Sequence, residues 1–558
     1  MFEDFDHVDL AGRSLRTIPV VLHQHADSII SLKLSRNPML EIPLDFIQSC
    51  TTLRDLRLSN MAMKKVPTSV RQATTLHRLD LSSNRIGDLE EAYLDNLTVL
   101  TSLLVQNNRI EKLPWHFPRL RTLVTLNISN NKFRVFPPAI CYLEALRDLD
   151  ISFNMIAELP EEPGRLMGLE RLVLIGNQVA RFPDEWRHLR HLRVLDCRRN
   201  LISGLHIVSM LPALHTLSAD HNAVQALNLA VGPCLATLDA SHNEITQLEL
   251  LKGPVGTPYA LTSLDISHAK LSSLDEIALG TLASLRTLRI DHNTFRAIPE
   301  TLGDLVYLET LSCADNKLDS LPASIGKLQR LEELDAHNNS LTELPSTLWN
   351  CASLRRVNVT SNFLGMWHDP PAMPFVDDSQ VGFHSASTFS LSLSMGDVTS
   401  PMPPAPGMPV GRKTSVGSLG GSGSTLVGLT RMLPPLVHSL EKLYLGENRL
   451  TDDVLQTLMI FKGLRVLNLS FNDLQDLPMN FLRDFTLLEE LYLSGNKLAS
   501  IPTEDLHRMG RLSILYLNGN RLQTLPQELG KVKSLTVLDV GSNLLKYNVN
   551  NWEFDWNW

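Results

Sequence analysis

Four histidines recur at nearly constant spacing and could do titratable or metal-binding chemistry. His221, His242, His268 and His292 follow one another at intervals of 21 to 26 residues. A neutral imidazole binds transition metals, and its proton equilibrium lies near physiological pH. A polar residue at the solvated end of each strand would give the same spacing without any function. No cysteine or second column of carboxylates accompanies the histidines to complete a metal site. We keep both interpretations of this histidine column.

A second set of candidates is cationic and lies within three successive segments of similar sequence. Guanidinium groups in such a cluster would suit carboxylates on a partner protein. Asp148, Glu170 and Asp196 lie among them, so mutual neutralisation is the competing interpretation. The predicted partner-binding residues are Arg147, Arg171, Arg193, Arg198 and Arg199.

Catalytic motifs are absent from the sequence. It contains no G-x-x-x-x-G-K-[ST], H-E-x-x-H, G-x-S-x-G or C-x-x-C pattern. Aspartates such as Asp80, Asp150 and Asp239 recur singly at long intervals, which suits a polar binding surface better than a paired general acid and base. We therefore predict no catalytic residue and no bound cofactor or metal in this chain.

A repeat positions all of these residues. The segment from Leu76 to Asn84 reads L-x-x-L-x-L-x-x-N, and this frame recurs about 21 times at a spacing near 23 residues, which is the pattern of leucine-rich repeats. Each x-L-x-L becomes a short strand with its leucines turned inward, and stacked neighbours bury leucines that one repeat cannot bury alone. We predict an α/β-type solenoid, a leucine-rich-repeat horseshoe. It has a long parallel sheet on its concave side and loops with short helical turns on its convex side.

Most repeats carry asparagine at the ninth position of the frame. A buried side-chain amide can satisfy turn backbone groups in its own and the adjacent repeat, so the column needs no ligand to explain it. The predicted structural ladder includes Asn84, Asn108, Asn131, Asn154, Asn177 and Asn200.

Two stretches break the regularity. Over residues 202–285 the Leu-Pro signal that ends many strands vanishes. A second stretch is rich in Pro, Gly and Ser, which predicts a disordered insertion. Within it, Arg412-Lys-Thr-Ser415 has the pattern that a basophilic kinase recognises, so Ser415 is a candidate phosphosite. The predicted organisation is a repeat array over 1–365, the insertion over 366–433, the array continued over 434–545 and an aromatic tail over 546–558.

Composition limits the classes of partner. The net charge of −9 arises from 60 acidic and 51 basic side chains spread along the chain, which argues against nucleic acid. The chain has no secretory signal, no long uncharged apolar stretch, and six scattered cysteines without disulfide or zinc spacing. We therefore predict a cytoplasmic protein without a membrane span.

The segment 541–558, which ends Trp556-Asn-Trp558, is more specific than any leucine repeat. It closely resembles the end of the main repeat array in fungal adenylate cyclases. The repeats at Leu491–Asn496 and Leu515–Asn520, and the insertion upstream of Leu440, are similar to that family in the same order. The resemblance spans essentially the whole chain.

This resemblance implies a regulatory role, namely contact with small GTPases of the Ras type, whose acidic effector surface would favour the arginine cluster. The family also implies a phosphatase-2C-like domain and a cyclase domain that uses metal-bound ATP; we expect the present sequence to end before both. It would then be a protein-binding section of an adenylate cyclase in cyclic AMP signalling, recruited peripherally to the plasma membrane through the GTPase. The alternative is a free-standing cytosolic scaffold that links a GTPase or phosphatase to its targets.

Overall fold

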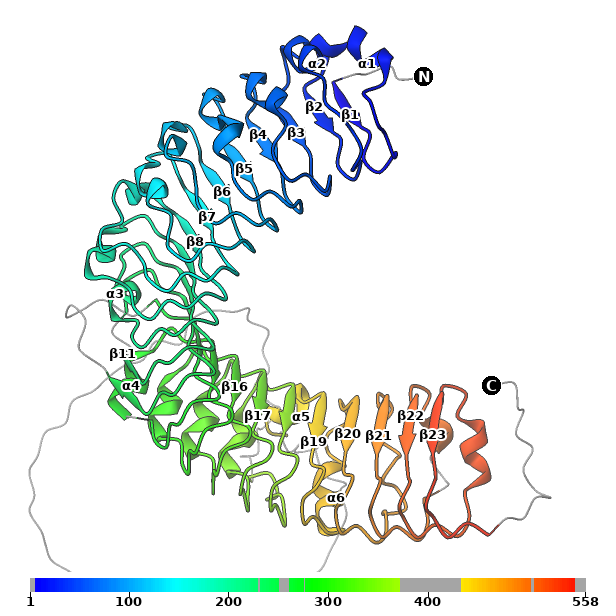
Figure 1. Cartoon of the computed structure of the whole chain (residues 1–558). Helices are drawn as coiled ribbons and strands as arrows, with labels where there is room; N and C mark the ends of the chain where they lie inside the picture. The colour runs from blue at the N-terminus through cyan, green and yellow to red at the C-terminus, as the bar shows by residue number, and fades with distance from the viewer. Residues whose placement is uncertain are drawn as a thin grey trace, which may run out of the picture. The chain divides into compact units, whose positions relative to one another are not determined.

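The computed structural model describes residues 6–228, 231–249, 260–274, 276–371, 433–502 and 506–546 (Figure 1). Contacts divide the chain into two units, residues 1–370 with 435–558, and residues 371–434. The first unit contains all the described helices and strands. Of the second unit only residues 371, 433 and 434 are described, so Ser415 lies outside the described residues.

Within the described residues, 21 strands of the first unit pair side by side in one parallel sheet. Each spans three residues, and its central apolar residue faces the core, as Leu79 does in strand β4 (Arg78–Asp80). This sheet confirms the predicted leucine-rich-repeat solenoid. The remaining strands of the sheet are β1 His7–Asp9, β2 Ser31–Lys33, β3 Asp55–Arg57, β5 Ser102–Leu104, β6 Thr125–Asn127, β7 Asp148–Asp150, β8 Arg171–Val173, β9 Val194–Asp196, β10 Thr216–Ser218, β12 Thr237–Asp239, β14 Ser263–Asp265, β15 Thr287–Arg289, β16 Thr310–Ser312, β17 Glu333–Asp335, β18 Arg356–Asn358, β19 Lys442–Tyr444, β20 Val466–Asn468, β21 Glu490–Tyr492, β22 Ile514–Tyr516 and β23 Val537–Asp539.

Short helices lie on the side of the repeats opposite the strands (Figure 1). Many follow a Leu-Pro pair, because proline cannot donate to the strand ladder and its φ suits the residue before a helical turn. Pro322, for example, has φ −66° and directly precedes a 3₁₀ turn, while Leu321 is buried. The α-helices are α1 Val20–Gln24, α2 Leu44–Ser49, α3 His206–Ser209, α4 Glu276–Thr281, α5 Leu436–Ser439 and α6 Asp453–Leu458. The 3₁₀ turns are η1 Ala26–Ser28, η2 Thr68–Gln72, η3 Glu90–Ala92, η4 Leu94–Asn96, η5 Phe117–Arg119, η6 Pro138–Tyr142, η7 Leu166–Gly168, η8 Asp184–His188, η9 Glu300–Asp304, η10 Ala323–Lys327, η11 Ser346–Asn350, η13 Leu506–Arg508 and η14 Gln527–Lys531.

Most asparagines of the frame are buried and bond to backbone in two repeats. Asn154 donates from Nδ2 to the carbonyls of Ile128 (3.2 Å), Ile151 (3.0 Å) and Ser152 (3.1 Å), and its Oδ1 accepts the N–H of Phe133 (3.1 Å). These bonds join each turn to the preceding one, so the amides need no ligand. Amide donation to the previous repeat and to its own recurs at Asn84, Asn108, Asn131, Asn177 and Asn200.

The sheet continues without interruption across the long insertion. Strand β18 pairs directly with β19, with Val357 opposite Leu443. The chain stays packed beyond residue 366, where the insertion was predicted to begin: Trp367 is buried against Trp349 and Phe461, with ring centroids 5.6 Å away in both cases. The predicted boundary is therefore wrong at this end, because an aromatic side chain among prolines anchors the segment to the core. Residues 372–432 lie outside the described residues.

The irregular stretch contains a second, two-stranded parallel sheet. Strand β11 (Ala226–Asn228) pairs with β13 (Gln247–Glu249), with Leu227 opposite Leu248. Both strands lie four to six residues after the frame asparagines Asn222 and Asn243, where other repeats carry the Leu-Pro pair that precedes a 3₁₀ turn. Strand pairing therefore occurs where the proline is missing. Within the described part of the chain, no helix combines the length and apolar character needed to cross a membrane.

Candidate functional site

The sheet turns the side chains between its leucines toward solvent. In β9, Val194 and Asp196 flank the buried Leu195, and adjacent strands are in register with them. Residues at one position of adjacent strands lie about 4.8 Å apart, so they form rows across the repeats. We number positions from the first leucine of the frame, so that the ladder asparagine is position 9. Positions 3, 5 and 7 then lie on the sheet face, and positions 8 and 10 lie in the turn that follows.

The five predicted arginines do not form one cluster. Arg147 and Arg193 precede strands β7 and β9, and Arg171 is the first residue of β8. Arg198 and Arg199 follow β9, at the opposite end of the strand from Arg193. Because an extended residue advances about 3.3 Å, the Cα atoms of Arg193 and Arg199 are separated by roughly 20 Å at full extension. The arginines are therefore divided between the two ends of the strands.

Acidic neighbours neutralise three of these arginines. The Arg198 guanidinium donates hydrogen bonds to Asp196, and these raise its pKa further above its usual range. Arg193 and Arg199 are exposed, and their side chains form no ion pair or hydrogen bond with the described residues. Mutual neutralisation thus applies to three arginines, and two remain available to a partner. The neutralised pairs are Arg147 with Glu170 (3.8 Å), Arg171 with Asp148 (3.0 Å) and Arg198 with Asp196 (2.7 Å).

The four histidines form a continuous stack at position 8. Ring centroids of successive imidazoles are 4.2, 3.9 and 4.0 Å apart, with the rings within 19° of parallel. Each residue has a left-handed backbone, with φ between 51° and 54°. Carboxylates meet both ends: Asp220 lies 2.8 Å from Nδ1 of His221, and Asp315 lies 3.2 Å from Nε2 of His292.

This stacking bears on the two kinds of chemistry considered for the column, titration and metal binding. Imidazole lone pairs lie in the ring plane, so rings stacked face to face cannot direct several nitrogens at one metal ion. Across the described ranges, no group of three or more His, Cys, Asp or Glu is arranged to hold a metal. Burial, together with the charges of His242 and His292, lowers the pKa of His268. The geometry therefore fits a titratable column better than a metal site.

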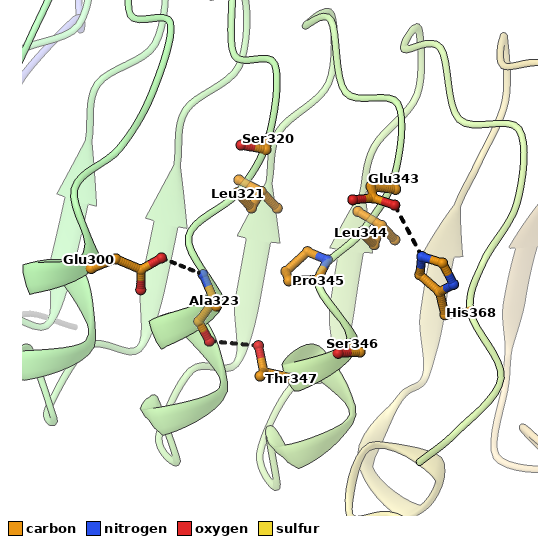
Figure 2. Close-up of a pocket in the computed structure, with 10 residues that line it drawn as sticks. All are labelled: Glu300, Ser320, Leu321, Ala323, Glu343, Leu344, Pro345, Ser346, Thr347 and His368. Atoms are coloured by element: carbon orange, nitrogen blue, oxygen red, sulfur yellow. Dashed lines mark hydrogen bonds and ion pairs between the residues drawn. The ribbon is translucent and has the colours of Figure 1, made fainter.

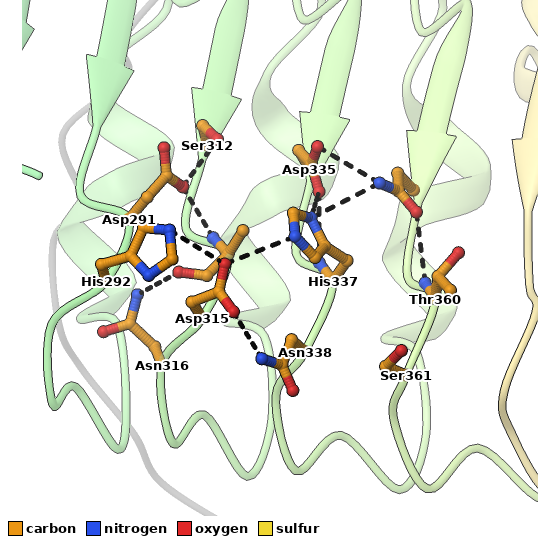
Figure 3. Close-up of polar contacts among 12 residues, drawn as sticks. Asp291, His292, Ser312, Asp315, Asn316, Asp335, His337, Asn338, Thr360 and Ser361 are labelled. Atoms are coloured by element: carbon orange, nitrogen blue, oxygen red, sulfur yellow. Dashed lines mark hydrogen bonds and ion pairs between the residues drawn. The ribbon is translucent and has the colours of Figure 1, made fainter.

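A polar network extends from the last histidine toward β18 (Figure 3). Asp315 bridges His292 and His337, at 3.2 and 3.4 Å, and Asp335 lies 2.7 Å from Nδ1 of His337. Asp291 accepts bonds from the Ser312 hydroxyl and a backbone N–H, both at 2.7 Å, and burial raises the pKa of its carboxyl. These carboxylates are occupied within the network, which suits a fixed polar surface.

Tyrosines form a row that the sequence analysis missed. Tyr444, Tyr492 and Tyr516 occupy position 5 of β19, β21 and β22 and are half-buried on the sheet face. The rings of Tyr492 and Tyr516 meet edge to face at 5.2 Å, and Arg356 lies over the ring of Tyr444 at 5.4 Å. Tyrosine and arginine are enriched in protein interfaces. Alignment of the position-5 residues alone would have revealed this row.

A hollow of about 570 Å³ lies beside the 3₁₀ turns η9 to η11, away from the sheet face (Figure 2). Several of its polar groups already have partners in the protein. Glu300 accepts the N–H groups of Ala323 (2.9 Å) and Ser324 (2.7 Å), bonds that lower the pKa of its carboxyl, and His368 lies 3.1 Å from Glu343. Glu300 therefore supports the next repeat and is not poised for catalysis.

The stacked repeats define a class: the chain is a leucine-rich-repeat protein. Residues 259–364 match the family described as leucine-rich repeat region, and residues 98–156 and 438–498 match the family described as leucine rich repeat. Among solved structures, YopM from Yersinia enterocolitica gives a TM-score of 0.61 at 22% identity, over 94% of this chain and 90% of that one. A leucine-rich-repeat protein from Leptospira interrogans gives 0.59 at 28% identity, over 64% and 91%.

Curated relatives narrow the class. The adenylate cyclase of Mycosarcoma maydis is 45% identical over 99% of this chain and 22% of its own length. That of Podospora anserina is 38% identical over 99% and 28%, and that of Schizosaccharomyces pombe 30% over 83% and 26%. The predicted resemblance to the leucine-rich-repeat region of fungal adenylate cyclases is confirmed. The chain spans about a quarter of the length of these relatives. The tryptophan-rich end that suggested the resemblance lies outside the described residues.

Proposed function

We propose that this chain is the regulatory, protein-binding section of an adenylate cyclase and that it docks a Ras-type small GTPase. The observation that carries the proposal is the match over 99% of the chain to relatives named adenylate cyclase, within a region built of leucine-rich repeats. Stacked repeats present an extended surface that suits a protein partner. In this role the chain controls cyclic AMP signalling and contributes no catalytic group itself.

Two arginines are best placed to meet the acidic effector surface of such a GTPase. Arg193 and Arg199 are exposed and unpaired among the described residues, whereas Arg147, Arg171 and Arg198 already have acidic neighbours. An unpaired exposed guanidinium can form a charge-assisted bond without first breaking one. Docking there would recruit the chain from the cytoplasm to the membrane that holds the GTPase.

Charge reversal tests this docking face. We expect Arg193→Glu with Arg199→Glu to weaken binding of a GTP-loaded Ras-type GTPase about tenfold, which corresponds to about 1.4 kcal/mol, measured by titration calorimetry. The matched control is Arg36→Glu with Arg355→Glu. Arg36 shares position 8 and a left-handed backbone with Arg199, and Arg355 shares position 2 with Arg193. Equal weakening in both variants would contradict the proposed face.

Catalysis is tested separately. The purified chain, incubated with ATP and Mg²⁺ or Mn²⁺, is expected to form no cyclic AMP above the level without protein. Cyclic AMP formation that a point substitution in the repeats abolishes would contradict the regulatory assignment.

A further inference from the structure

Three cations stand in a line on the turns that follow β4, β5 and β6. Arg85, Arg109 and Lys132 each occupy position 10 of successive repeats, and all three are exposed. Their side chains form no ion pair or hydrogen bond with any described residue. We call these three residues the cationic column.

Adjacent repeats touch at this position. The N–H of Arg109 donates to the carbonyl of Ile86 (2.9 Å), and that of Lys132 donates to the carbonyl of Ile110 (2.9 Å). In three other repeats a cation at position 10 contacts a matching side chain in the preceding repeat, whereas the side chains of Lys317 and Arg521 contact none among the described residues. These matched contacts are Lys270 with Glu244 (3.1 Å), Lys497 with Asp473 (2.5 Å) and Arg449 over the ring of Phe363 (4.5 Å).

The cationic column therefore places like charges where those three repeats place partners. Like charges on neighbouring repeats, whose backbones lie about 4.8 Å apart, repel one another, and added salt screens this repulsion. Asp88 and Glu111 lie in the same turns but form no ion pair with the column among the described residues, and Asp88 instead accepts the N–H of Glu90 (3.2 Å). Lys112 and Arg134 add two further exposed or partly exposed cations nearby. The free surface carries a positive charge that an anionic partner would relieve.

The surroundings of the column suit a polypeptide. Asn107 and Asn130, at position 8 beside it, are exposed amides: Asn130 Nδ2 donates to Asn107 Oδ1 (2.6 Å), and Asn107 Nδ2 donates to Ser83 Oγ (3.3 Å). The Oδ1 of Asn130 has no donor among the described residues and can accept from a peptide N–H. The next repeat places Phe153 and Met155 at positions 8 and 10, with 53% and 37% of their surfaces exposed. A row of cations beside amides, ended by apolar side chains, matches an extended acidic segment that carries an apolar residue at one end.

We propose that Arg85, Arg109 and Lys132 form a docking site for an acidic segment of a partner protein, distinct from the GTPase face. In an extended segment, alternate carboxylates on one side recur about every 6.8 Å, within reach of long side chains that start about 4.8 Å apart. Two of the three cations are arginines, whose forked donors hold carboxylates in two bonds. A membrane surface fits less well, because a flat bilayer would also set anionic headgroups against the exposed carboxylates of Asp88 and Glu111, whereas one extended segment can contact the column and leave them in solvent.

A labelled oligoglutamate peptide that ends in phenylalanine tests the site by fluorescence anisotropy with the whole chain. At low salt we expect binding that weakens as salt is raised, and at least a tenfold loss of affinity for Arg109→Glu with Lys132→Glu. The matched control, Lys317→Glu with Arg521→Glu, changes exposed position-10 cations that have no described partner. The position-10 neighbours of Lys317 are uncharged, and the cationic neighbour of Arg521, Lys497, is already paired with Asp473. The control is expected to change the affinity less than twofold.

Parallel measurements separate the alternatives. Melting curves of both variants should match the unaltered chain, because every changed residue is exposed. Absence of peptide binding, equal losses in both variants, or binding of phosphatidylserine vesicles in preference to the peptide would overturn the proposal. The probe contains no GTPase, so a chain that fails to bind the GTPase would still bind this peptide if the cationic column acts as proposed.

Discussion

The substitution Asn154→Ala removes one rung of the asparagine ladder, and its cost can be worked out bond by bond. The carbonyl of Ile128 also accepts from Asn131 (3.0 Å), and that of Ile151 also accepts from Asn177 (3.0 Å). The carbonyl of Ser152 keeps the N–H of Asn130 (2.8 Å). Each carbonyl therefore retains a partner after the substitution.

The N–H of Phe133 loses its acceptor. It donates to Oδ1 of Asn154 at 3.1 Å, and both residues are buried. An orphaned buried donor costs about 1–3 kcal/mol, and the three lost carbonyl bonds add roughly 1 kcal/mol together, since each carbonyl stays bonded. We expect Asn154→Ala to lower the free energy of unfolding by about 2–4 kcal/mol.

Urea unfolding followed by circular dichroism measures this loss, with amide hydrogen exchange at Phe133 as the local readout. Asn96→Ala is the control, because Asn96 is exposed and its side chain makes no hydrogen bond with the described residues; its effect should stay within about 0.5 kcal/mol. A loss below 1 kcal/mol for Asn154→Ala, or unchanged exchange at Phe133, would refute the ladder's structural role.

Three other predictions concern separate parts of the chain. The pKa of His268 is lower in the folded chain than the value of about 6.5 expected for an unfolded one, so His268 is protonated first in the unfolded chain as pH falls. The folded chain should therefore keep its stability above about pH 6.5 and lose stability below it. This imidazole interacts with the charged groups of His242, His292, Asp265 and Asp315. On acidification, the urea midpoint should fall less for His268→Asn than for the unaltered chain, and an equal fall in both would contradict this account. Trp367→Ala should lower the free energy of unfolding, measured in urea, by about 3 kcal/mol, because the indole is buried. A loss below about 0.5 kcal/mol would contradict the packing of Trp367 against the core. Burial raises the pKa of Cys50 and Cys141 to about 11, so roughly one in a thousand of these thiols is a thiolate at pH 8. Iodoacetamide should therefore label the exposed Cys234 first. Labelling of all three at the same rate would contradict the burial of Cys50 and Cys141.

The fold could be predicted from the sequence because one signal repeats. Leucines at fixed positions decide which residues enter the core, and the asparagine after each strand decides where the chain turns. The pairing of β11 with β13 carried no such signal, since Ala226–Asn228 and Gln247–Glu249 are short alternating stretches in repeats of uneven length. Trp367 was assigned to the insertion because its proline-rich neighbours outweighed one aromatic residue.

The candidate site was harder to predict, because it depends on contacts between repeats. The histidine spacing indicated a column, but only the ring geometry distinguishes stacked imidazoles from converging metal ligands. The arginines were grouped because they come from adjacent predicted strands, whereas Arg193 and Arg199 lie at opposite ends of one strand. The tyrosine row and the cationic column become visible only when residues at the same position of successive repeats are compared.

The central claim is that the repeats dock a Ras-type GTPase in its GTP-bound form through the region around β9. Hydrogen-exchange mass spectrometry of the chain, with and without the GTP-loaded GTPase, tests it most directly. We predict slower exchange in the turn after β9 that contains Arg199, and none with the GDP-loaded form. Unchanged exchange in that turn, or equal protection by both nucleotide states, would contradict the claim.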